Sequence, residues 1–176
     1  ALRHYLSGVK DAVVLDFFAG SGTTAHAVMR LNRQDNGSRS CILVTNNEVA
    51  ASEQLDLRKR GLRPGDADWE SQGIYELVTK ARVTAAVTGK TPSGDPLVGE
   101  YRFVDEFPFA EGFEENVAFL RLSYESPLRI RADRDFGQIA KLLWLRSGGR
   151  GRVIDALPHG WAVSDTYGVL RDLDKT

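Results

Sequence analysis

The hydrophobic pattern predicts alternating strands and helices in the first half of the chain. An almost wholly apolar segment, residues 12–17, precedes a turn of small residues, and helical spacing follows over about residues 23–32. A second apolar segment covers residues 40–45, with helical spacing again over 50–60 and 73–87. Apolar strands without alternation are typical of parallel sheets covered on both faces. The pattern therefore predicts an α/β fold whose first strand is central and parallel.

The second half of the chain is patterned more weakly. Gly, Pro, Ser and Asp are frequent in residues 89–99, which is the composition of a linker or a hairpin loop. Beyond this loop we predict strands over 101–105 and 116–124, a helix over 134–146 and a hairpin over 160–170. The chain thus divides into an α/β part, a loop and a C-terminal α+β region, with boundaries at 1–90, 91–99 and 100–176.

The turn after the first strand has the composition of a cofactor-binding loop. Asp16 ends the strand, and Gly20 and Gly22 follow before the helix begins. Glycine allows backbone conformations and close approaches that a Cβ forbids, and the first N–H groups of a helix are free to donate to a ligand. The spacing Gly20-x-Gly22-x-x-Ala25 also fits the loose dinucleotide fingerprint. An NAD(P)-binding oxidoreductase domain therefore remains an alternative.

Two acidic residues bear on the choice of cofactor. Asp16 beside the loop would repel a pyrophosphate, whereas it would attract the sulfonium and amino groups of S-adenosylmethionine. Glu48, just past the second strand, can accept hydrogen bonds from both ribose hydroxyls of either cofactor. An acid that faces the dipole of the next helix is the structural alternative for Glu48.

The run from Asp16 to Thr24, DFFAGSGTT, closely resembles the S-adenosylmethionine-binding motif of the amino-methylating DNA methyltransferases. It is most similar to the adenine-N6 enzymes and to the modification subunits of type III restriction systems. Enzymes of this family methylate either adenine-N6 or cytosine-N4, and the cofactor motif leaves both targets open. The resemblance implies a Rossmann-like methyltransferase sheet, S-adenosylmethionine as cofactor, DNA as substrate and a restriction subunit as partner. A homodimer is an option for the full-length protein. The resemblance covers most of residues 12–90 and the remainder only vaguely.

The resemblance also implies the roles of the site residues. The turn would wrap the methionine part of the cofactor, and the two threonines would offer hydroxyls and N–H groups to its carboxylate. Asp16 would contact the amino group, and Glu48 the ribose. The predicted cofactor-binding residues are Asp16, Phe17, Phe18, Ala19, Gly20, Ser21, Gly22, Thr23, Thr24 and Glu48.

The family's catalytic motif, a polar residue followed by two prolines and an aromatic, is absent from this sequence. No two of the 6 prolines are adjacent. In the family this motif holds the target base after it leaves the duplex. We therefore predict no catalytic residue in this chain. In the permuted class typical of type III modification subunits the catalytic motif lies upstream, so we expect a C-terminal portion that is inactive alone.

Composition limits the partners and the compartment. The net charge of -1 argues against a globally basic nucleic-acid binder. The single cysteine, Cys41, forms no intrachain disulfide and indicates a reducing, cytoplasmic compartment. Cysteine and histidine are too few for a metal-ligand cluster, and no apolar run approaches the roughly 20 residues of a membrane span.

DNA contact must come from a local basic patch or from parts of the protein outside this chain. The densest cluster is Arg58, Lys59, Arg60 and Arg63, which could contact phosphates or could form a solvated helix end. A further alternative is that residues 99–176 act as a docking scaffold for a restriction partner.

Overall fold

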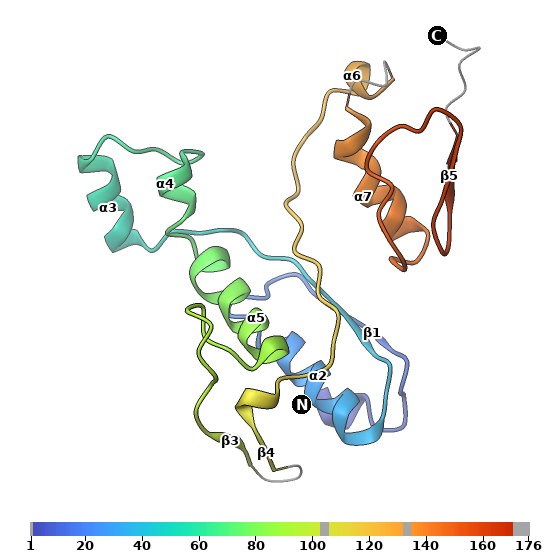
Figure 1. Cartoon of the computed structure of the whole chain (residues 1–176). Coiled ribbons are helices and arrows are strands. Elements are labelled where there is room, and N and C mark those ends of the chain that lie inside the picture. The colour runs from blue at the N-terminus through green and yellow to red at the C-terminus, as the bar shows by residue number, and fades with distance from the viewer. Residues whose placement is uncertain (1, 103–105, 132–134, 171–176) are drawn as a thin grey trace. The chain divides into compact units, whose positions relative to one another are not determined.

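The computed structural model describes residues 2–102, 106–131 and 135–170. The chain packs into two compact units, residues 1–119 and residues 120–176 (Figure 1). Residues 91–99 lie inside the first unit.

The first unit contains a parallel pair of strands joined by a helix. Strand β1 (Val13–Asp16) pairs in parallel with β2 (Ser40–Leu43), with Leu15 opposite Ile42. Helix α2 (Thr23–Asp35) connects the two strands and packs against β2. Two parallel strands require such a crossover, because a short turn cannot return the chain to the same end. The predicted strand–helix–strand order is confirmed.

One face of this sheet is exposed, so the prediction that the first strand is central and covered on both faces is wrong for this unit. Val13 and Leu15 are 65% and 51% exposed, and Ile42 on β2 is 52% exposed. On the other face, Cys41 and Leu43 pack against the core beneath α2. The described residues give β1 a single partner strand, β2, in a two-stranded sheet.

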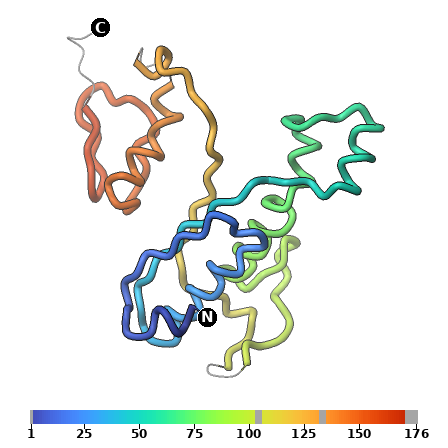
Figure 2. The backbone as a smooth tube through the Cα atoms, turned by 180° about the vertical axis from the view of Figure 1, so that it is seen from behind, coloured from blue at the N-terminus to red at the C-terminus, as the bar shows by residue number. Residues whose placement is uncertain are grey.

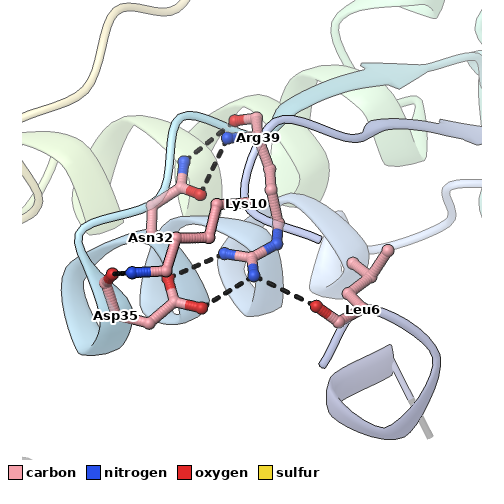
Figure 3. A network of polar contacts seen from close by, with 5 residues as sticks. All are labelled: Leu6, Lys10, Asn32, Asp35 and Arg39. Atoms are coloured by element: carbon pink, nitrogen blue, oxygen red, sulfur yellow. Dashed lines mark hydrogen bonds and ion pairs between the residues drawn. The ribbon is translucent and has the colours of Figure 1, made fainter. Parts of the chain in front are cut away.

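A buried arginine ties the end of α2 to the start of β2 (Figure 3). Arg39 donates to both carboxylate oxygens of Asp35, at 2.8 and 2.7 Å, and to the backbone oxygen of Leu6 at 3.1 Å. The side chain of Asn32 bonds to the backbone N–H and oxygen of Arg39. This network fixes the α2–β2 connection, and it holds α1 (Leu2–Tyr5) close to α2.

The middle of the chain is helical. Two short helices, α3 (Ala51–Lys59) and α4 (Ala67–Glu70), pack around buried Leu57 and Trp69. The predicted long helix follows, but its first part is the π-helical η1 (Tyr75–Lys80) and only its second part is α-helical, as α5 (Ala81–Thr88). Helix α4 was not predicted, because its four residues are too few to show a period. Both Figure 1 and Figure 2 show α5 beside α2, which it contacts.

Aromatic rings close the core of the first unit. Strands β3 (Glu100–Tyr101) and β4 (Phe107–Pro108) pair antiparallel, and the 3-10 turn η2 (Phe109–Glu111) follows. Their rings pack with Phe113 on apolar residues of α2 and α5. Of the strand predicted over 101–105, residues 103–105 lie outside the described residues.

The described part of the second unit contains two helices and a hairpin. Helices α6 (Pro127–Arg131) and α7 (Phe136–Arg146) precede the antiparallel strands β5 (Trp161–Val163) and β6 (Gly168–Leu170). The predicted helix and hairpin are thus confirmed. The strand predicted over 116–124 is wrong, because those residues form no strand. Among the described residues, no helix combines the length and apolarity needed to cross a membrane.

Candidate cofactor site

The glycine turn is held at the end of the parallel sheet. The backbone N–H of Val44 donates to the oxygen of Asp16 at 2.8 Å, and the N–H of Ala19 donates to the oxygen of Val44 at 3.1 Å. The sheet pairing therefore continues past β2 and fixes the start of the turn. Gly20 and Gly22 have φ values of 50° and 75°, which are left-handed conformations that favour glycine.

Asp16 stabilises the turn itself. One oxygen of its carboxylate accepts the N–H of Phe18 at 3.0 Å, and the other accepts the hydroxyl of Thr24 at 2.6 Å. These bonds join the end of β1 to the first turn of α2. The aspartate therefore has an architectural role that the sequence analysis did not predict.

The start of α2 leaves backbone donors available. Gly22 is its N-cap and supplies no side-chain hydrogen bond, because glycine has no side chain. The first N–H groups of a helix have no intrahelical acceptor. In this 13-residue helix they carry the partial positive charge of the helix dipole. The turn thus presents donors suited to an anionic group such as a carboxylate.

The bend around Gly20 is open, whereas Gly22 is packed. A Cβ at Gly20 would meet only the backbone oxygen of Phe18, at 3.8 Å. A Cβ at Gly22 would lie 3.1 Å from Cγ2 of Val83. Phe17 and Phe18 are 61% and 93% exposed. Among the described residues, no core side chain fills the bend at Gly20, and the rings of Phe17 and Phe18 are available to a ligand.

The glycine turn is also contacted by the helical segment η1–α5. The hydroxyl of Thr79 donates to the oxygen of Gly20 at 2.5 Å, and Arg82 donates to the hydroxyl of Ser21 at 3.0 Å. Sequence reasoning missed both contacts because about sixty positions separate the partners. The turn sequence itself, residues 19–24, does not indicate which segment packs on it.

Glu48 lies in the extended segment between β2 and α3, and its side chain is exposed. Its backbone oxygen accepts the N–H of Ile74 at 2.9 Å. The hydroxyl of Thr79, which contacts Gly20, also lies 3.3 Å from the oxygen of Ile74. The same helical segment therefore contacts both the glycine turn and the backbone of Glu48.

Two groups near the site have shifted pKa values. Burial, followed by the charges of Arg82 and Arg30, lowers the pKa of His26 on α2. Burial, followed by the charge of Asp16, raises the pKa of Cys41 to about 11. A thiol with so high a pKa stays protonated at neutral pH, which suits a packed side chain rather than a nucleophile.

Local contacts engage part of the predicted basic cluster. Lys59 pairs with Asp56 at 2.9 Å, and the guanidinium of Arg58 lies 5.9 Å from the centre of the Trp69 ring. Arg60 and Arg63 are exposed. These two side chains are the members best placed to contact a phosphate.

Residues 6–56, which include the glycine turn and Glu48, match the family model described as DNA methylase. The chain is 44% identical over 175 residues to the Type III restriction-modification enzyme StyLTI Mod subunit of Salmonella typhimurium, with 90% of this chain and 24% of that protein covered. It is 60% identical over 86 residues to the EcoPI Mod subunit of Escherichia phage P1, covering 49% and 12%. It is also 65% identical over 37 residues to the Type II methyltransferase M.KpnI of Klebsiella pneumoniae, covering 21% and 9%.

The chain spans about a quarter of the StyLTI Mod subunit and less of the others. The family match contains the strand–turn–helix unit, and the similarity to the StyLTI Mod subunit extends through both compact units. The chain is therefore similar to the DNA methylase family over residues 6–56 and, over 90% of its length, to a Mod subunit of a type III restriction-modification enzyme.

Proposed function

We propose that this chain is the S-adenosylmethionine-binding portion of a site-specific adenine-N6 DNA methyltransferase from a restriction-modification system. The observation that carries the proposal is the open bend at Gly20, which lies between a carboxylate at the end of β1 and the uncapped start of α2. The methionine end of the cofactor is zwitterionic, so acceptors on one side and donors on the other match it.

The residues present fit this cofactor. The N–H groups at the start of α2 would bind the carboxylate, and the exposed Phe18 ring would cover the turn. The remaining lone pairs of Asp16 would accept from the amino group, and the exposed carboxylate of Glu48 would accept from the ribose hydroxyls. When bound, the cofactor supplies an electrophilic methyl group to an exocyclic amine of a base. The chain's own contribution is to orient it and to match its charges.

The complete enzyme extends the proposal. The parallel pair β1–β2 would be part of a larger Rossmann-like sheet, and the paired-proline motif that holds the base would come from another part of the polypeptide. DNA would be the substrate, and a restriction subunit the partner, as the names of the type III relatives suggest. By itself this chain should bind cofactor without methylating DNA.

Calorimetry with S-adenosylhomocysteine tests the proposal. The unaltered chain should bind, and Glu48→Ala should weaken binding by at least about tenfold, since it removes acceptors for two hydroxyls. Glu53→Ala is the matched control, because Glu53 is an exposed acid on the neighbouring helix α3. Equal binding by the two variants would remove Glu48 from the site.

A titration with NADH separates the dinucleotide alternative. The fluorescence of NADH should not change on mixing with the chain, because the Asp16 carboxylate beside the turn would repel a pyrophosphate. Binding of NADH without binding of S-adenosylhomocysteine would overturn the proposed function.

A further inference from the structure

Each of three successive residues of the glycine turn has a partner on the segment η1–α5. Thr79 donates to the backbone oxygen of Gly20, Arg82 donates to the hydroxyl of Ser21, and Val83 packs against Gly22. Thr79 and Val83 are each only 3% exposed, so these two contacts belong to the packed interior. The segment η1–α5 therefore fixes the shape of the turn from a position far along the sequence.

Arg82 differs from Thr79 and Val83 because its side chain is exposed and charged. Among the described residues its guanidinium has one hydrogen-bond partner, the hydroxyl of Ser21, and no acidic partner. A guanidinium has five N–H donors, so most of them remain free. Burial or an ion pair would give an arginine a structural role in the fold. Arg82 is exposed instead, and its hydrogen-bond partner is the neutral hydroxyl of Ser21 in the turn.

The surroundings of Arg82 favour an anion. Its charge reaches the first turn of α2, where it acts on His26 together with Arg30. The helix start adds its own partial positive charge there. The nearest acid of the turn, Asp16, is already engaged by Phe18 and Thr24. The cationic side of the turn is therefore formed by Arg82 and the start of α2 together.

We propose that Arg82 recognises the carboxylate of the cofactor's amino-acid end, and that Ser21 holds its guanidinium in place for this contact. This inference rests on the proposed function and deepens it. It assigns to η1–α5 a direct part in cofactor selection, in addition to supporting the turn. Arg82 would distinguish ligands that carry the carboxylate from ligands that lack it.

Calorimetry with two ligands tests the assignment on the full chain. The ligands are S-adenosylhomocysteine and its decarboxylated form, which keeps the adenosine, the sulfur and the amine. Arg82→Ala should weaken S-adenosylhomocysteine binding by roughly tenfold or more, the usual effect of a hydrogen bond to a charged group, and should leave the decarboxylated ligand unchanged. Arg82→Gln, which can still bond to Ser21 but has no charge, should lose as much. Arg3→Ala, which changes an exposed arginine on α1 of the same unit, should bind both ligands normally.

The possible results distinguish a failure of the Arg82 assignment from a failure of the proposed cofactor binding. Equal weakening of both ligands by Arg82→Ala would show that Arg82 only supports the turn, and would overturn the inference. Normal binding by Arg82→Gln would overturn it too, since the charge would then be dispensable. If the unaltered chain binds neither ligand, the proposed function itself is contradicted.

Discussion

His26 connects the candidate site with the aromatic core. Its imidazole lies 2.8 Å from the hydroxyl of Tyr101, and its ring meets Phe113 edge-on with the centroids 5.5 Å apart. Its pKa lies below the ordinary value of 6.5, because burial and two arginines oppose the charged form. The folded chain therefore binds a proton at His26 less readily than the unfolded chain does.

This difference predicts a pH dependence of stability. Above 6.5 the imidazole is neutral in both states and its contribution to stability is complete. As the pH falls below 6.5, the unfolded chain takes up the proton first, so the free energy of unfolding decreases until the folded pKa is passed. Urea denaturation at about pH 8 and about pH 5.5 measures the decrease.

His26→Gln isolates the contribution of this residue. Glutamine can still bond to Tyr101 but does not titrate, so the loss of stability between the two pH values should be smaller in the variant. An equal loss in both proteins would assign the dependence to other groups.

At the scale of elements, the strand–turn–helix unit was predictable and its supports were not. The apolar segments and the glycines fix β1, the turn and α2 through local rules of burial and backbone conformation. The roles of Thr79 and Arg82 depend on packing between distant segments, which no local pattern encodes. The bonds of Asp16 to Phe18 and Thr24 are local, but the same residue type also suits a ligand contact.

The incorrect prediction of a strand over residues 116–124 has a local cause. In the segment predicted as a strand, Val117 and Phe119 alternate, but Leu120 and Leu122 continue out of phase. A strand needs one face to pack, and this run offers none in register. Leu122 is accordingly 98% exposed.

The packing of the aromatic rings in the first unit predicts how much stability is lost when one ring is removed. Phe113→Ala should lower the free energy of unfolding by about 3 to 5 kcal/mol, because it leaves a cavity among packed rings. Phe113 is 2% exposed, whereas Phe18 is 93% exposed. Phe18→Ala is therefore the matched control, and it should change stability by no more than about 0.5 kcal/mol. Urea denaturation compares them, and similar losses would mean that the rings do not form the core.

At the scale of the whole molecule, the net charge of -1 means that the proposed DNA binding would depend on a local basic patch. We predict that the double variant Arg60→Ala, Arg63→Ala weakens DNA binding equally for all sequences. It should also reduce the slope of log affinity against log salt by about two, since each phosphate contact contributes about 0.9. Filter binding over a range of salt concentrations measures both effects.

The matched control removes two exposed arginines of the second unit, Arg150→Ala and Arg152→Ala. An unchanged slope in the first variant, or an equal reduction in the control, would count against the Arg60–Arg63 patch.

The bare face of the β1–β2 sheet has a practical consequence. Val13, Leu15 and Ile42 form a water-facing strip on a short sheet whose other side is already packed. Parallel strands are normally sheltered on both sides. In solution this apolar strip would favour self-association. The isolated polypeptide should therefore aggregate more readily as its concentration rises.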